Sequence, residues 1–167
     1  NNIFAEIKAQ QVRNEPFVGV NIGTDVSNLP SPPDLVAFLQ SRKINHVRLY
    51  EADPQILKAL AKTKIRVIVS VPNNQLLAIG SSNATATTWI CRNVIAYLPD
   101  TLITAIAVGD EVLTTIPSSA PLLIPAIESP CNVLVASIHT QIKISTLRSA
   151  SIILDPFPPY QTYFNQT

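Results

Sequence analysis

Two adjacent carboxylates follow one of the most apolar runs of the chain. Asp110 and Glu111 come directly after ITAIAV, residues 103–108, and Gly109, where a buried strand would open into a loop. Apolar surroundings disfavour an ionised carboxyl group, which suits a general acid that works near neutral pH. We therefore expect Glu111 to act as a general acid/base. The alternative is structural, because Asp110 or Glu111 could instead cap a following helix.

Polar side chains also stand at the ends of three other apolar runs. Asn21 closes the first run, Arg48 and Tyr50 close the second, and Asn73 follows the third. Barrel enzymes place their catalytic residues at the carboxyl ends of parallel strands, so polar groups gathered there are candidates for an active site. Arg48 lies inside its run, where burial would force it to pair with a carboxylate, so we interpret it as structural.

These residues must be positioned by short apolar runs that alternate with segments of helical period. The expected strands are residues 17–22, 44–49, 65–71, 103–108 and 141–145, and the expected helices are residues 34–42, 55–63, 84–97 and 121–137. Nearly continuous Val and Ile is typical of strands that are buried on both faces. The alternation of strand and helix predicts parallel βαβ units.

Two architectures fit such units, a doubly wound sheet and a (β/α) barrel. The phosphate-binding pattern G-x-G-x-x-G is absent, since the glycines are Gly19, Gly23, Gly80 and Gly109. The polar strand ends favour the barrel, but a complete barrel has eight strands and about 250 residues. We therefore predict an α/β fold of the (β/α) TIM-barrel type. It is incomplete, with about five to six of the eight βα units in a single domain over residues 1–167.

Composition excludes several classes of function. The 12 Lys and Arg residues nearly balance the 11 Asp and Glu residues, for a net charge of +1 without a basic cluster, which argues against nucleic-acid binding. No apolar run approaches the roughly 18 residues needed to cross a bilayer, so we expect no membrane span. No cluster of Cys, His and carboxylates has metal-ligand spacing, and we predict neither a metal nor a cofactor.

Some features bear on the cellular compartment. Cys91 and Cys131 could pair as a disulfide, or could both be buried free thiols. Asn83 and Asn165 each begin an N-x-T sequon, which can carry a glycan in a secreted protein. The N-terminal residues NNIFAEIKAQQ lack a basic stretch followed by an apolar run, so we expect no signal peptide in this chain.

Five segments, taken in order, resemble one enzyme family. They are GVNIG at 19–23, NLPSP at 28–32, VRLYEADP at 47–54, VIVSVPN at 67–73 and ITAIAVGDEVL at 103–113. From about residue 17 to residue 157 the chain resembles the amino-terminal half of plant endo-β-1,3-glucanases of glycoside hydrolase family 17. The resemblance implies a secreted (β/α)₈ barrel of the plant cell wall, with a role in plant defence, that hydrolyses β-1,3-glucans with retention of configuration.

The resemblance also implies roles for single residues. Glu111 closes the family's VG-N/D-E motif and is implied to be the general acid/base. Tyr50 resembles a tyrosine near the catalytic carboxylates, and Asn21 and Asn73 match cleft positions whose amides can bind sugar hydroxyls. Asp110 stands where the family usually has Asn, and we expect it to contact substrate as an acceptor. The alternatives are local packing for Tyr50 and strand-end turns for the two asparagines.

The second catalytic group is expected to be missing. A retaining glycosidase needs a nucleophilic carboxylate about 5–5.5 Å from the acid. The family's nucleophile lies in the carboxyl-terminal half, and no carboxylate here matches its motif. The alternative is therefore an inactive glucan-binding or structural remnant of the same fold. An incomplete barrel also leaves two unpaired strand edges, through which we predict a homodimer.

Overall fold

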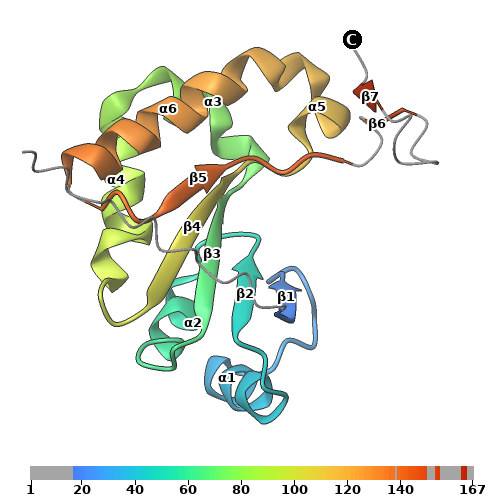
Figure 1. Cartoon of the computed structure of the whole chain (residues 1–167), viewed down its shortest axis with the longest axis vertical. Coiled ribbons are helices and arrows are strands. Elements are labelled where there is room, and N and C mark those ends of the chain that lie inside the picture. The colour runs from blue at the N-terminus through green and yellow to red at the C-terminus, as the bar shows by residue number, and fades with distance from the viewer. Residues whose placement is uncertain (1–16, 138, 150–152, 155–162, 165–167) are drawn as a thin grey trace, which may run out of the picture.

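Five parallel strands form one sheet in the order of the chain (Figure 1). They are β1 (Gly19–Ile22), β2 (His46–Leu49), β3 (Arg66–Val71), β4 (Leu102–Val108) and β5 (Lys143–Ser145). The structure is a computed structural model that describes residues 17–137, 139–149, 153–154 and 163–164. Within these residues the predicted parallel α/β arrangement is confirmed, and β1 and β5 each pair with one neighbour only. A separate antiparallel pair is formed by β6 (Ile153–Leu154) and β7 (Tyr163–Phe164).

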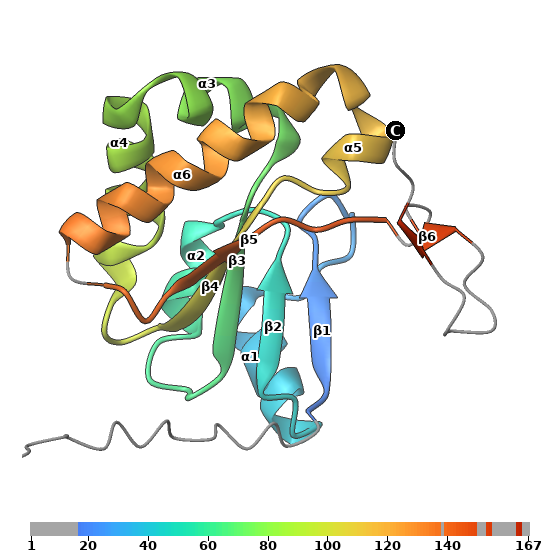
Figure 2. The same ribbon diagram turned by 45° about the horizontal axis from the view of Figure 1, so that its top comes forward.

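Helices follow each of the first four strands. They are α1 (Pro32–Ser41), α2 (Pro54–Ala59), α3 (Leu76–Ser81), α4 (Asn83–Asn93), α5 (Val112–Thr115) and α6 (Ala120–Ala136), with short 3₁₀ turns η1 (Asn73–Gln75), η2 (Ile95–Tyr97) and η3 (Pro117–Ser119). Figure 2 shows α6 running across the upper part of the molecule beside α3 and α4. All four predicted helices are present, but α2 is shorter than expected and α4 ends before η2. The sequence did not predict α3 or α5.

Two helix starts follow directly from local chemistry. The Ser31 hydroxyl caps α1 by accepting from the Asp34 amide, and the Asp53 carboxylate caps α2. Asp53 Oδ1 accepts from the amides of Gln55 and Ile56, both at 2.8 Å. A proline follows each cap, where its missing N–H costs no hydrogen bond.

One face of the sheet is covered by helices, and the opposite face, which we call the open face, is partly exposed at β1 and β2. Side chains alternate between faces along a strand, so residues in register share a face. Val47, Val67 and Ile103 are in register and at most 4% exposed, because the helices cover them. Asn21 and Arg48, in register with each other on the opposite face, are not buried. The polar residues of β1 and β2 therefore lie on the open face of the sheet.

The expectation that no apolar segment is long enough to cross a bilayer is wrong for Pro117–Ala136. By length and composition this 20-residue segment, which covers η3 and α6, is apolar enough to cross a bilayer. A single such helix is weak support for a span, because core helices of soluble proteins meet the same criterion. In the structure α6 packs on α3 and α4, with Leu123, Ala126 and Leu134 buried. These contacts make α6 a packing helix of this fold.

The two cysteines form neither the disulfide nor the pair of buried thiols that the sequence suggested as alternatives. Cys91 on α4 and Cys131 on α6 are both free and both exposed, so they are neither paired nor buried. Asn83 is the first residue of α4 and is exposed, as a glycan acceptor must be. Asn165 lies outside the described residues.

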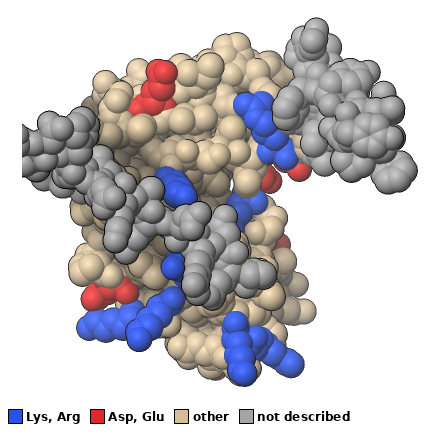
Figure 3. Space-filling view, viewed as in Figure 1, with Lys and Arg blue, Asp and Glu red and all other residues tan. Residues whose placement is uncertain are grey.

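Charged side chains are scattered over the surface. Figure 3 shows Lys and Arg in separate groups on one face, accompanied by Asp and Glu, rather than in one continuous basic patch. An example is the exposed pair of Lys62 and Asp100, whose nitrogen and oxygen lie 3.9 Å apart. An exposed pair of this kind contributes little to stability.

His46, at the start of β2, is expected to make folding pH-dependent. Burial, and secondarily the charge of Arg66, lowers its pKa below the ordinary value of 6.5. The folded protein therefore binds this proton less tightly than the unfolded chain does. The contribution of His46 to stability is full above pH 6.5 and is lost as the pH falls through the lowered pKa of the folded state. Urea midpoints measured down a pH series should fall less in His46→Gln than in the parent chain. An equal fall in both proteins would contradict this assignment.

Candidate active site

Glu111 occupies a constrained turn at the carboxyl end of β4. Gly109 has φ +70°, and Glu111 has φ 48° and ψ 38°, both in the left-handed region. A non-glycine residue there is uncommon and costs conformational energy, so neighbouring contacts must hold it. The Gly109 amide donates to the Val71 carbonyl at 2.9 Å, and the hydroxyls of Thr114 and Thr115 donate to the Glu111 carbonyl, each at 2.9 Å.

The carboxylate of Glu111 is available for chemistry. Glu111 is in the N-cap position of α5, but its side chain makes no capping hydrogen bond. Among the described residues its carboxylate has neither a hydrogen bond nor an ion pair. The capping alternative for Glu111 is therefore wrong. A half-buried carboxylate without a partner is suited to exchanging a proton with a ligand.

Asn73 holds the backbone beside Glu111. Its side-chain Oδ1 accepts from the Asp110 amide at 2.7 Å, and its Nδ2 donates to the Asp110 carbonyl at 2.9 Å. This pair of hydrogen bonds ties the segment after β3 to the segment after β4. The Asn73 amide was predicted to contact sugar, but in the structure it is engaged with this backbone.

Arg48 organises the side chain of Asp110. Arg48 Nη2 lies 3.0 Å from Asp110 Oδ1, and Arg48 Nε donates to Ser70 Oγ at 3.1 Å. The guanidinium carbon is 4.4 Å from the centre of the Tyr50 ring, within the range of a cation–π contact. The prediction that Arg48 pairs with a carboxylate is confirmed. Among the described residues no amide of α5 donates to the Asp110 carboxylate, so Asp110 does not cap this helix.

The structure brings most of the predicted site residues together. Tyr50, Asn73 and Asp110 are linked to one another through Arg48 and the Asp110 backbone, and Glu111 is the next residue along. Tyr50 is 41% exposed, so part of this residue is accessible to a ligand. Asn21 is also exposed, one residue before the end of β1, and meets this group only through the pairing of β1 with β2.

Ser70 was not identified from the sequence. Its hydroxyl is buried, at 2% exposure, and accepts from Arg48. The sequence could have indicated this residue through the strand period. Ile68 is in register with Arg48, and Ser70, two residues further along the strand, lies on the same face as both. In the described part of the chain no group of three or more His, Cys, Asp or Glu side chains is arranged to hold a metal ion.

Replacing Asn73 by alanine is expected to destabilise the protein by about 2 kcal/mol, because the Asp110 amide loses its partner and the Asp110 carbonyl keeps only the 3.3 Å hydrogen bond from the Thr115 hydroxyl. Urea denaturation followed by circular dichroism measures the change. The matched control is Asn74→Ala, at the exposed neighbouring residue, which should change stability by less than about 0.5 kcal/mol. Equal stability of the two variants would show that the Asn73 hydrogen bonds do not hold the turn.

The comparison with protein families agrees with this geometry. The model of glycosyl hydrolases family 17 matches residues 18–167.

This chain belongs to glycosyl hydrolases family 17.

Glucan endo-1,3-beta-glucosidase 1 of Arabidopsis thaliana is 74% identical over 162 residues, which is 96% of this chain and 32% of that protein. Glucan endo-1,3-beta-glucosidase 2 of the same plant is 53% identical over 152 residues, which is 90% of this chain and 30% of that protein. This family 17 chain thus spans about a third of the length of these curated relatives.

A solved structure shares the arrangement of the chain. CJP38, a beta-1,3-glucanase and allergen of Cryptomeria japonica pollen, superposes with a TM-score of 0.85 at 34% identity. The match covers 90% of this chain and 48% of that protein. The resemblance inferred from the five sequence segments is therefore confirmed at the level of the family.

Proposed function

We propose that the protein containing this chain hydrolyses internal bonds of β-1,3-glucans and that Glu111 is its general acid/base. The observation that carries the proposal is the unpartnered Glu111 carboxylate, held in a left-handed turn at the carboxyl end of a parallel strand. Parallel-strand enzymes place their catalytic groups at such ends. The substrate class is taken from the names of the relatives, which are glucan endo-1,3-beta-glucosidases.

Tyr50 and Asn21 are the proposed sugar contacts on the open face, because both side chains are exposed. Asp110 and Asn73 contribute mainly by positioning, since Asp110 pairs with Arg48 and Asn73 holds the Asp110 backbone. Their remaining lone pairs and protons can still meet sugar hydroxyls. The carboxylate of Asp110 accepts only, whereas the amide of Asn73 both donates and accepts.

We further propose that the five-stranded sheet is the first part of a (β/α)₈ barrel, with its open face as the barrel interior. The relatives are about three times as long as this chain, which leaves room for the remaining strands and for a nucleophilic glutamate. A second carboxylate about 5–5.5 Å from Glu111 would give the retaining reaction. A secreted glycoprotein of the cell wall, with a glycan on the exposed Asn83, fits this proposal.

Release of reducing ends from laminarin, a soluble β-1,3-glucan, tests the function. We expect the full-length protein to release them, and to release far fewer from carboxymethylcellulose, whose β-1,4 bonds present a different geometry. The 167-residue chain alone should release few, because we propose that the nucleophile is supplied by the remaining strands of the barrel. A full-length protein that binds laminarin without cleaving it would instead support the inactive glucan-binding remnant.

The unpaired edges give a separate prediction for the 167-residue chain on its own. Among the residues that the structure describes, β1 and β5 each have one free edge, and an exposed edge of a sheet is a template for pairing with another chain. We expect two copies to associate and cover each other's open face. Sedimentation velocity at micromolar concentration should show a dimer. A monomer that binds no hydrophobic dye would contradict this prediction.

A further inference from the structure

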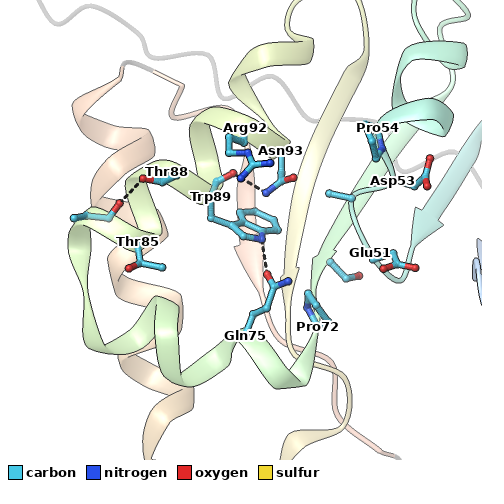
Figure 4. A pocket seen from close by; sticks show the side chains of 13 residues that line it. Glu51, Asp53, Pro54, Pro72, Gln75, Thr85, Thr88, Trp89, Arg92 and Asn93 are labelled. Carbon is cyan, nitrogen blue, oxygen red and sulfur yellow. Dashed lines mark hydrogen bonds between the residues drawn. The ribbon is translucent and has the colours of Figure 1, made fainter.

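A cavity of about 650 Å³ lies between the segment after β2 and helix α4. Figure 4 shows Trp89, Arg92 and Asn93 from α4 on one side, Glu51 and Asp53 on the other, and Pro72 and Gln75 between them. Its volume falls within the roughly 300–1,000 Å³ typical of ligand pockets. None of Asn21, Tyr50, Asn73, Asp110 and Glu111 lines it, although it adjoins the Arg48 network at Ser70.

The walls of this cavity, which we call the α4 pocket, carry unused donors and acceptors. The indole nitrogen of Trp89 donates to Gln75 Oε1 at 2.9 Å, which fixes the ring and leaves the Gln75 amide protons free to donate. Within the described residues Arg92 has no hydrogen-bond or ion-pair partner. On the opposite wall, Glu51 Oε1 accepts from the Thr24 hydroxyl and Asp53 Oδ1 caps α2. In the part of the chain that the structure describes, the second oxygen of each carboxylate has no hydrogen-bond or ion-pair partner.

This combination selects a class of ligand. The lining contains one guanidinium, that of Arg92, and two carboxylates, those of Glu51 and Asp53, so the pocket has no excess positive charge to hold a phosphate or another anion. A hydroxyl both donates and accepts, so different hydroxyls of one saccharide can accept from Arg92 on one wall and donate to Glu51 on the other. The edge of Trp89, together with Pro54 and Pro72, supplies apolar surface for the C–H groups of a sugar ring.

We propose that the α4 pocket is a second saccharide-binding site, separate from the site around Glu111. The class of ligand, a neutral oligosaccharide, follows from the lining of the pocket. The choice of a β-1,3-linked glucan rests on the proposed function. Such a site would hold a glucan chain against the protein while another part of the polymer occupies the Glu111 site.

Trp89 provides a direct readout, because it is the single tryptophan of the 167-residue chain. We would titrate the Glu111→Gln chain, in which hydrolysis is blocked, with laminarihexaose and follow tryptophan emission. A saturable change is expected. Arg92→Gln should weaken the apparent affinity about fivefold or more through loss of a charged donor. Gln75→Glu, which keeps an acceptor for Trp89 but removes the free amide donor, should weaken it similarly.

The matched control is Arg42→Gln, which removes an exposed arginine at the end of another helix, α1, and should leave the affinity unchanged. The proposal is overturned if emission does not respond to laminarihexaose, if Arg92→Gln binds as tightly as the parent, or if inorganic phosphate binds better. It is also overturned if Tyr50→Ala abolishes the response, since the signal would then come from the Glu111 site. If the full-length parent protein did not hydrolyse laminarin while the titration was intact, the proposed function would fail and this binding site would stand.

Discussion

Replacing Glu111 by glutamine in the full-length protein is expected to lower kcat on laminarin by about 10²–10⁴-fold, the usual contribution of a general acid or base. Glutamine keeps the size and the hydrogen-bonding reach of the side chain but cannot transfer a proton. Since the fold and the sugar contacts of Asn21 and Tyr50 are untouched, KM should change little. Initial rates of reducing-end release over a range of laminarin concentrations separate the two constants.

The control for this experiment is Glu128→Gln, which removes an exposed carboxylate on α6. It should leave kcat and KM unchanged. A Glu111→Gln protein that is folded and retains more than about a tenth of the parent kcat would mean that proton transfer depends on another group. The Asp110 carboxylate would then be the next candidate, and its pairing with Arg48 would need to break.

Gly109→Ala is expected to have the largest effect on the turn itself. Its φ of +70° disfavours any side chain, and an added Cβ would lie 2.4 Å from Val112 Cγ2 and 3.1 Å from Asn73 Oδ1. The left-handed backbone costs about 1–2 kcal/mol for alanine, and relieving such a clash costs about 1–3 kcal/mol more. We therefore expect a loss of about 3 kcal/mol in unfolding free energy, measured by urea denaturation.

Gly23→Ala is the matched control for this substitution. Gly23 does not have a positive φ, and an added Cβ would meet Tyr50 Cδ2 at an ordinary 3.5 Å. Its stability should lie within about 1 kcal/mol of the parent. If Gly109→Ala were as stable as Gly23→Ala, the turn that carries Glu111 would accommodate a side chain at position 109, and the prediction would be wrong.

The sequence predicted the order of strands and helices because apolar periodicity and capping residues are local signals. It missed α3 because a helix of six residues, Leu76–Ser81, is too short for a periodic pattern. Gly80 within it also weakens the helix signal. The structure gives the reason for this glycine, since a Cβ there would lie 3.2 Å from the backbone of α6 at Leu122 and Ala126.

Glu111, Tyr50 and Asn73 each follow a strand end, so the sequence marked them as candidates for the site. It also predicted a carboxylate partner for Arg48, but it did not identify which residues contact one another. Their interactions depend on which strands are neighbours: Asn73 and Asp110 are 37 positions apart and meet because β3 pairs with β4. The α4 pocket likewise depends on how α2 and α4 are arranged in space, and no local sequence pattern predicts that arrangement.

The measurement that tests the role of Glu111 most directly compares two leaving groups. A sugar alcohol leaves poorly and needs a proton from the general acid, whereas 2,4-dinitrophenolate leaves without one. The full-length Glu111→Gln protein should lose about 10²–10⁴-fold in kcat on laminarin but should form the first product from a 2,4-dinitrophenyl laminaribioside at nearly the parent rate. Equal losses on both substrates would contradict the assignment of Glu111 as the general acid.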